Sequence, residues 1–126
     1  MQFKELEKKV LLWAGAKNLL LPKNTYQQYA KFQEESTEIL VAMNKEVFLF
    51  NTAQSLDVTN SVSKEDYKLK IKAVDTELKD AFGDTLVTLI ILAAKYGLGL
   101  EECLELAYNE IKDRTGKTVG GTFIKD

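Results

Sequence analysis

Two short segments of this chain concentrate carboxylates at helical spacing. In residues 31–38, KFQEESTE, three of them stand close together: Glu34, Glu35 and Glu38. At about 100° per residue, a helix places these three on one face, with Lys31 one turn earlier. Carboxylates this close repel one another unless a cation neutralises them or water surrounds them. The segment therefore predicts either a cation site or a solvated acidic face, and the second is the commoner outcome for such runs.

A second acidic stripe lies in residues 77–84, ELKDAFGD, where Glu77, Asp80 and Asp84 are spaced i, i+3, i+7. The run that follows, 86–94, is apolar nearly all round, which predicts a buried helix. We therefore expect Asp84 to enter the interior, where an unpaired carboxylate is costly. Gly83, next to Asp84, is an unfavourable residue within a helix, and it predicts that a neighbouring helix or a ligand approaches the backbone closely there. Two acidic helix faces beside a buried segment predict that a hard divalent cation binds between them, either Mg²⁺ or Mn²⁺.

The composition excludes several kinds of chemistry. The chain has no histidine and one cysteine, Cys103, which we expect to be a packing residue. Ser-His-Asp and Cys-His arrangements, di-iron Glu-x-x-His sites, thiolate zinc sites and an intramolecular disulfide are therefore ruled out. Any acid–base or metal chemistry must therefore use carboxylates, Lys, Tyr or water. The formal net charge of −2 argues against a nucleic-acid polymer as the main partner.

The 126 residues, 45% hydrophobic and 29% charged, predict a single globular domain over 1–126 with a Gly-rich tail at 116–126. Lys4, Glu5 and Glu7 interrupt the N-terminal segment before any apolar run, so we expect no signal peptide. The apolar run 86–94 is too short to span a bilayer. We expect a cytoplasmic protein with no membrane partner.

Hydrophobic periodicity predicts an all-α chain, a bundle of four to five helices. The expected helices cover about 3–17, 25–50, 64–96 and 100–114, with a polar loop over 51–62. Trp13, in the first helix, has two interpretations: core packing, or a surface on which a planar base stacks. Lys112 and Arg114 at the end of the last helix either complement its macrodipole or, with Asn109, hold phosphates.

The order of these motifs resembles a known family. Glu34-Glu35-x-x-Glu38 on one helix, followed by Asp80-Ala81-Phe82-Gly83-Asp84-x-Leu86-Val87 on another, looks like the MazG-like all-α nucleoside triphosphate pyrophosphohydrolases. The resemblance extends from Trp13 to the Gly-rich tail. It implies a helical bundle of the all-α NTP pyrophosphatase type that assembles as a homodimer or homotetramer. It also implies Mg²⁺-dependent hydrolysis of (d)NTPs to the monophosphate and pyrophosphate.

The resemblance also implies roles for individual residues. Glu35, Glu38 and Asp84 would be metal ligands, and Glu34 would orient or activate water. By their charge, Lys31, Lys112 and Arg114, with Asn109 nearby, would hold the substrate's phosphates, and Trp13 or a Tyr would stack on its base.

The chain departs from the family pattern in two places. Ala81 stands where the family has a Glu three residues before the Asp. Asp80 is the expected substitute as a metal ligand, because i and i+4 lie as close on a helix as i and i+3; Glu77 is the other candidate. The separation between Glu38 and Asp84 is also longer than expected, and the 51–62 loop would absorb the excess.

Three functions are compatible with the sequence. The first is the pyrophosphohydrolase. The second is a non-catalytic helical interaction module of the same fold whose altered second motif no longer holds metal. The third is a hydrolase of a different phosphorylated small molecule. Metal binding separates the second from the others, and a substrate panel separates the first from the third.

Overall fold

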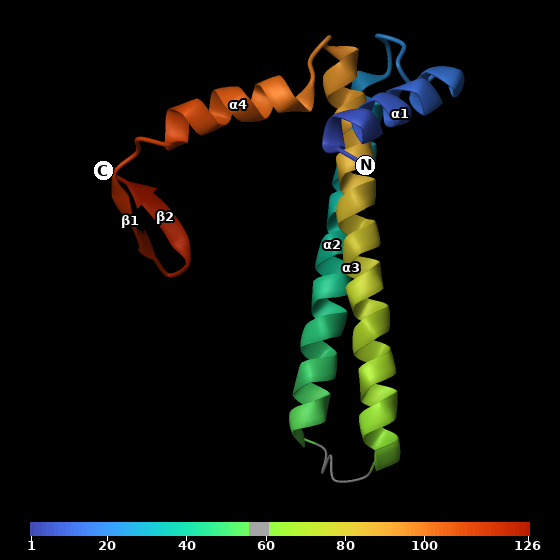
Figure 1. Ribbon diagram of the computed structural model, residues 1–126, viewed down its shortest axis with the longest axis vertical. Helices are drawn as coiled ribbons and strands as arrows, with labels where there is room; N and C mark the ends of the chain where they lie inside the picture. The colour runs from blue at the N-terminus through green and yellow to red at the C-terminus, as the bar shows by residue number, and fades with distance from the viewer. Residues whose placement is uncertain (56–60) are drawn as a thin grey trace.

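The computed structural model describes the backbone of residues 1–55 and 61–126, and the side chains of 1–52 and 64–126. Two long helices, α2 (Thr25–Ser55) and α3 (Ser61–Lys95), run antiparallel side by side as a tall pair (Figure 1). Helix α1 (Phe3–Ala16) crosses near the upper end of this pair and packs on α3. Helix α4 (Leu100–Ile111) leads away to a hairpin of β1 (Gly116–Val119) and β2 (Thr122–Lys125). The described chain is predominantly helical, as the sequence predicted.

Small side chains and one buried polar bond hold α2 against α3. The buried apolar residues are Ala14, Ala42, Val74, Ala81, Ile90 and Ile91. Ala42 of α2 and Ala81 of α3 are 3% and 6% exposed, and such short side chains let two helix backbones approach closely. Nearer the upper end, the buried Gln28 amide donates from Nε2 to the Thr88 carbonyl oxygen at 3.1 Å. This bond ties the first turns of α2 to the second half of α3.

The helix limits differ from the predicted ones mainly around the expected loop. Residues 51–55 continue α2 and residues 61–62 already belong to α3, so the prediction of a loop over 51–62 is wrong for these positions. Residues 56–60 lie outside the described part of the chain. The extra length between the two acidic stripes therefore extends the helical pair. Helix α3 has no break, and α4 ends at Ile111 rather than near 114.

The connection between α1 and α2 is anchored on the end of α3. Lys95 donates from Nζ to the carbonyl oxygens of Leu21 and Lys23, at 2.8 and 3.0 Å. Asn18 and Asn24 adopt positive φ angles of 59° and 66°, a conformation that asparagine tolerates better than most residues. These contacts fix where α2 begins relative to α3.

Helix α4 and the hairpin, residues 100–126, form an arm that leaves the helical pair (Figure 1). Gly97 ends α3 in the left-handed region, and the axis then turns by 94° into α4. The Glu102 carboxylate accepts a hydrogen bond from the Gly99 N–H at 2.9 Å and so begins the new helix. In the hairpin, Lys117 faces Ile124 and Thr118 faces Phe123. The tail predicted as a Gly-rich segment is thus a β-hairpin, which the sequence pattern did not predict.

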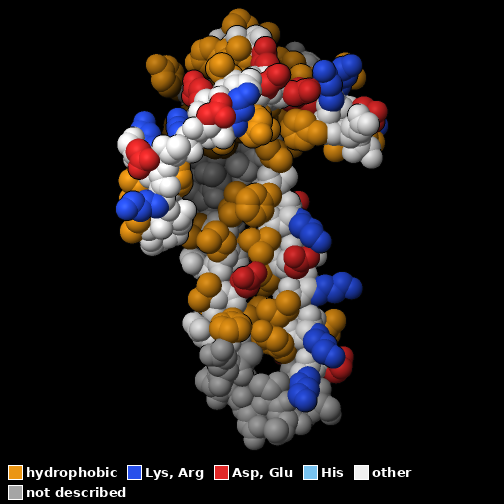
Figure 2. All heavy atoms as spheres, turned by 60° about the vertical axis from the view of Figure 1, so that its left-hand side comes forward, with side chains coloured by type: hydrophobic (Ala, Val, Ile, Leu, Met, Phe, Trp, Pro, Cys, Tyr) orange, Lys and Arg blue, Asp and Glu red, His pale blue; other side chains and the backbone are white. Residues whose placement is uncertain are grey.

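The apolar run 86–94 is buried or half-buried at every position except its first residue. Thr88, Ile90 and Ile91 are buried, whereas Leu86 is 42% exposed. Figure 2 shows hydrophobic side chains gathered on the face of the α2–α3 pair below the arm. Among the described helices, no single one is long and apolar enough to cross a membrane; the bent pair Lys64–Lys95 and Leu100–Ile111 meets that test by length and composition alone.

Candidate functional site

The two acidic stripes predicted from the sequence meet in one pocket of about 390 Å³ between α2 and α3. We call it the acidic pocket. Its lining from α2 is Glu34, Glu35, Glu38, Val41, Ala42 and Lys45, and from α3 it is Glu77, Asp80, Ala81 and Asp84. Antiparallel packing brings the stripes together although they lie on separate helices. Every carboxylate that the sequence assigned to catalysis or metal binding therefore lines the same space.

Lys31 neutralises one end of the acidic pocket. Its Nζ lies 3.1 Å from Oε1 of Glu35 and 3.3 Å from Oε1 of Glu34, one helical turn further along α2. These hydrogen bonds, first to Glu35 and then to Glu34, raise the pKa of the Lys31 ammonium. The Glu35 side chain is 19% exposed and the Glu34 side chain 64% exposed. Glu35 is thus the better sheltered of the two, while Glu34 remains open to water.

Lys45 neutralises the opposite end of the acidic pocket. Its Nζ crosses from α2 to lie 2.9 Å from Oε2 of Glu77 on α3. This lysine was not among the site residues predicted from the sequence. Its signal was present, since Lys45 follows Glu38 by seven residues and so falls on the same face of α2. What the sequence could not show is that Glu77 lies opposite.

Between these two lysines, three carboxylates have no cation. Among the described residues, Glu38, Asp80 and Asp84 form no ion pair. Desolvation, followed by the negative charges of Asp80 and Glu35, raises the pKa of Asp84, and the nearby Lys31 opposes the rise. The prediction that Asp84 enters the interior is wrong, because its side chain is exposed at the pocket. The cost of its anionic form comes first from desolvation and then from its acidic neighbours.

The donor set suits a hard divalent cation, although the ligands are not gathered around one point. Carboxylate oxygens are the ligands that Mg²⁺ and Mn²⁺ prefer, and Glu35, Glu38, Asp80 and Asp84 supply them from two helices. In the described part of the chain, no three or more acidic, Cys or His side chains converge closely enough to hold a metal ion. Mutual repulsion spreads uncompensated carboxylates apart, so bringing them onto a cation requires rotamer changes.

Ala81 stands where the motif that this chain resembles has a Glu, and it is part of the helix packing. Ala81 is 6% exposed and lies where α3 packs on α2. Its neighbour Asp80 lines the acidic pocket without a cation, whereas Glu77 is already paired with Lys45. Of the two candidate substitutes, Asp80 is therefore the one whose charge is uncompensated. The close approach expected at Gly83 does not occur within the described chain, because a Cβ placed there would meet nothing within 4 Å.

The predicted substrate-binding residues other than Lys31 lie away from the acidic pocket. Trp13 is 51% exposed on α1 and is neither a core residue nor part of the pocket lining. Asn109 belongs to the arm, and Lys112 and Arg114 follow the end of α4. Within one chain, then, these residues do not join the carboxylates.

Comparisons of the chain with protein-family models, with curated proteins and with solved structures found no match.

Proposed function

We propose that this protein is a metal-dependent hydrolase that converts (d)NTPs to the (d)NMP and pyrophosphate at the acidic pocket. One observation carries the proposal: six carboxylates from two helices line one pocket of about 390 Å³, and Glu38, Asp80 and Asp84 among them have no cation in the described part of the chain. A polyanionic substrate needs positive charge beside it, and uncompensated carboxylates bind divalent cations. The resemblance of the two motifs to the MazG-like family supports the same reaction.

In this proposal Glu35, Glu38, Asp80 and Asp84 hold Mg²⁺. When bound, Mg²⁺ neutralises triphosphate charge and lowers the pKa of a coordinated water. Glu34 remains open to water at the pocket, with a 64% exposed side chain, and it is placed to take the proton of the attacking water. The bond between the α-phosphorus and its bridging oxygen breaks, and pyrophosphate leaves with that oxygen.

Lys31 has two tasks in this scheme. Without substrate its ammonium balances Glu34 and Glu35. When a metal takes over Glu35, the Lys31 Nζ is free to turn toward a phosphate oxygen and form a charge-assisted hydrogen bond.

Pyrophosphate release from a panel of NTPs and dNTPs, with Mg²⁺ and with EDTA, tests the proposal. The expected result is metal-dependent release with the monophosphate as the other product. In ¹⁸O-labelled water the label should appear in the monophosphate, because the water attacks the α-phosphorus. Glu38→Gln should abolish turnover, whereas Glu46→Gln, on the same helix but outside the pocket lining, should leave it unchanged. Folded protein that hydrolyses no nucleotide would contradict the proposal.

A second candidate rests on the spread of the carboxylates. Because no three of them converge in the described residues, the same fold could act as a non-catalytic interaction module. Isothermal titration with Mg²⁺ and Mn²⁺ decides between the two: no metal binding favours the module. Metal binding with turnover of a phosphorylated compound other than a nucleoside triphosphate would instead identify a different hydrolase.

A further inference from the structure

The chain exposes far more surface than a folded protein of its size. Its accessible surface is 9831 Å², whereas a globular chain of 14.2 kDa has roughly 6,800 Å². The excess of roughly 3,000 Å² exceeds the approximately 1,000–2,500 Å² that each partner contributes to an obligate interface. The described core is small in proportion, with only six buried apolar residues, three of them alanine. A surface of this extent fits a chain that packs against a protein partner.

The arm is exposed along nearly its whole length, since every residue from 104 to 126 is exposed. Helix α4 carries an apolar stripe at i, i+3, i+4, i+7, i+8 and i+11: Leu100, Cys103, Leu104, Ala107, Tyr108 and Ile111. Leu104, Tyr108 and Ile111 are 71%, 58% and 51% exposed. A lone helix of this length is marginal in water, and so is a lone two-stranded hairpin. Both parts of the arm therefore require a surface that its own chain does not offer in the described residues.

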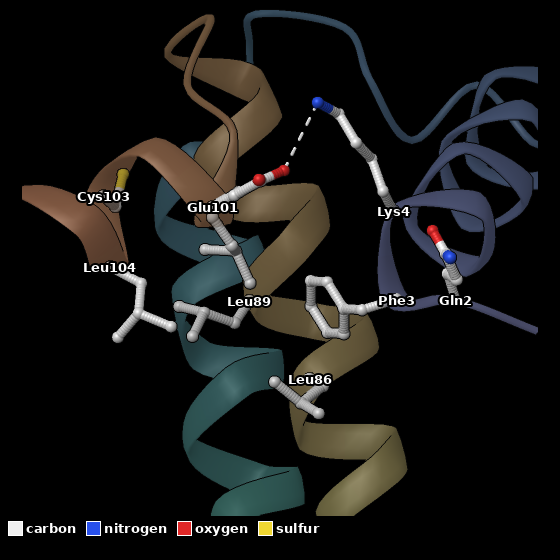
Figure 3. Close-up of a pocket in the computed structure, with 9 residues that line it drawn as sticks. Gln2, Phe3, Lys4, Leu86, Leu89, Glu101, Cys103 and Leu104 are labelled. Atoms are coloured by element: carbon white, nitrogen blue, oxygen red, sulfur yellow. Dashed lines mark ion pairs between the residues drawn. The ribbon is translucent and has the colours of Figure 1, made fainter.

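A groove at the base of the arm offers a complementary surface. It has a volume of about 790 Å³ and lies between α1, α3 and α4. Figure 3 shows Phe3, Leu86, Leu89 and Leu104 pointing into this space from three helices. The Lys4–Glu101 ion pair, at 3.4 Å, links α1 to α4 along one side. Hydrophobic side chains also gather on the exposed face of the helical pair below the arm (Figure 2).

The net charge of the end of the arm indicates which kind of surface it contacts. Residues 112–126 carry Lys112, Arg114, Lys117 and Lys125 against Asp113 and Asp126, a net positive segment. The acidic pocket carries the opposite charge. The arm cannot bring its cations to its own pocket in this arrangement, because α4 turns 94° away from α3 and runs for about 18 Å. Complementary surfaces that do not meet within one chain can meet between two copies of it.

We propose that two copies of this chain exchange arms. The arm of one copy packs its apolar stripe on the α2–α3 face of the other, and Lys112 and Arg114 thereby enter the acidic pocket of that second copy. The packing itself is independent of the reaction, whereas the role of the two cations as phosphate ligands rests on the proposed function. Each pocket is then built from two chains.

Sedimentation of two matched leucine variants tests the packing. Leu104 lies on the apolar stripe, and Leu106 lies about 200° further round the same helix; their exposures are similar, 71% and 67%. The parent chain should sediment as an oligomer, Leu104→Asp should shift it to monomer, and Leu106→Asp should not. The proposal is overturned if the parent chain sediments as a monomer, or if Leu104→Asp leaves the oligomeric state unchanged.

Mixing two inactive variants tests the exchange of cations. Glu38→Ala removes the pocket and Lys112→Ala/Arg114→Ala removes the arm's cations. If the arm acts on the other copy, an equimolar mixture after subunit exchange should recover about one quarter of parental activity, because half of the chains keep a pocket and half of those receive an intact arm. A mixture of Glu38→Ala with Asp84→Asn should recover none. No recovery in the first mixture, with normal sedimentation and helical circular dichroism, overturns exchange.

A crosslinking test separates a failure of this inference from a failure of the proposed function, because it needs no activity. In a Cys103→Ser background, Arg114→Cys on one chain and Asp80→Cys on another are mixed with a short bis-maleimide. A covalent heterodimer supports arm exchange even if no nucleotide is hydrolysed. Its absence, when each cysteine reacts with a monofunctional maleimide, counts against exchange even in an active enzyme.

Discussion

Lys45 on α2 and Glu77 on α3 form an ion pair across the helical pair, with Nζ 2.9 Å from Oε2. The pair lies at one end of the acidic pocket, and both side chains are about half exposed. It gives Glu77 a counter-charge and leaves Asp80, one turn further along α3, without one among the described residues. The pairing thus distinguishes two carboxylates that the sequence presents as equivalent candidates.

The first prediction follows from that distinction. Asp80→Asn should lower kcat/KM for the preferred triphosphate by about 100-fold or more, a loss of approximately 2.7 kcal/mol of transition-state stabilisation. Glu77→Gln should cost only about fivefold, since an exposed ion pair contributes little. Asp75→Asn, which removes a carboxylate paired with Lys79 outside the pocket, is the matched control on the same helix. Equal losses of kcat/KM for Asp80→Asn and Glu77→Gln would show that the ion pair with Lys45 does not exclude Glu77 from metal binding.

The second prediction concerns metal and stability. A cation that binds only the folded chain, at 100 times its Kd, stabilises it by about 2.7 kcal/mol, which is a rise of roughly 10 °C in Tm for a domain of this length. Differential scanning calorimetry with Mg²⁺ and with EDTA measures the rise. It should vanish in Asp84→Asn and persist in Glu46→Gln. An undiminished rise in Asp84→Asn would remove Asp84 from the ligand set.

The third prediction concerns pH in the absence of metal. Desolvation and the charges of Asp80 and Glu35 raise the pKa of Asp84, so the folded chain binds this proton more tightly than the unfolded chain does. The resulting stability is present below the unfolded pKa and is lost as the pH rises through the folded pKa. The Asp84→Asn variant should therefore gain stability over the parent as the pH increases from about 4 to about 8. Urea unfolding in EDTA across this range measures the difference; a gain that shrinks with pH would show the opposite sign.

The fourth prediction concerns the bond between α2 and α3. Gln28 is 8% exposed and donates to the Thr88 carbonyl. Gln28→Ala should lower the free energy of unfolding by about 1–3 kcal/mol, because it removes the buried hydrogen bond and leaves space behind. Gln27→Ala, at the exposed neighbouring position, should change it by less than about 0.5 kcal/mol. Equal effects in urea unfolding would mean that the buried bond contributes nothing specific.

The sequence by itself determined the helical nature of the chain, the start of each helix to within a few residues, and the two acidic stripes. These features are local, since a helix repeats every 3.6 residues and a stripe needs only neighbours on the same segment. The hairpin was equally local but was missed, although Gly120 and Gly121, with φ of 57° and 80°, make the two-residue turn that short hairpins favour.

Only the tertiary structure decided how the stripes face each other. Packing through Ala42 and Ala81 places the two helices so that Lys45 meets Glu77 and leaves Asp80 and Asp84 uncompensated within the described residues. The direction of the arm depends on the turn at Gly97, which removes Lys112 and Arg114 from their own pocket. Burial was overestimated for Asp84 and for Leu86, because an apolar run does not reveal how far its own chain covers it. Contacts between distant segments depend on shape and packing across the whole fold, so the helical periodicity of the sequence does not predict them.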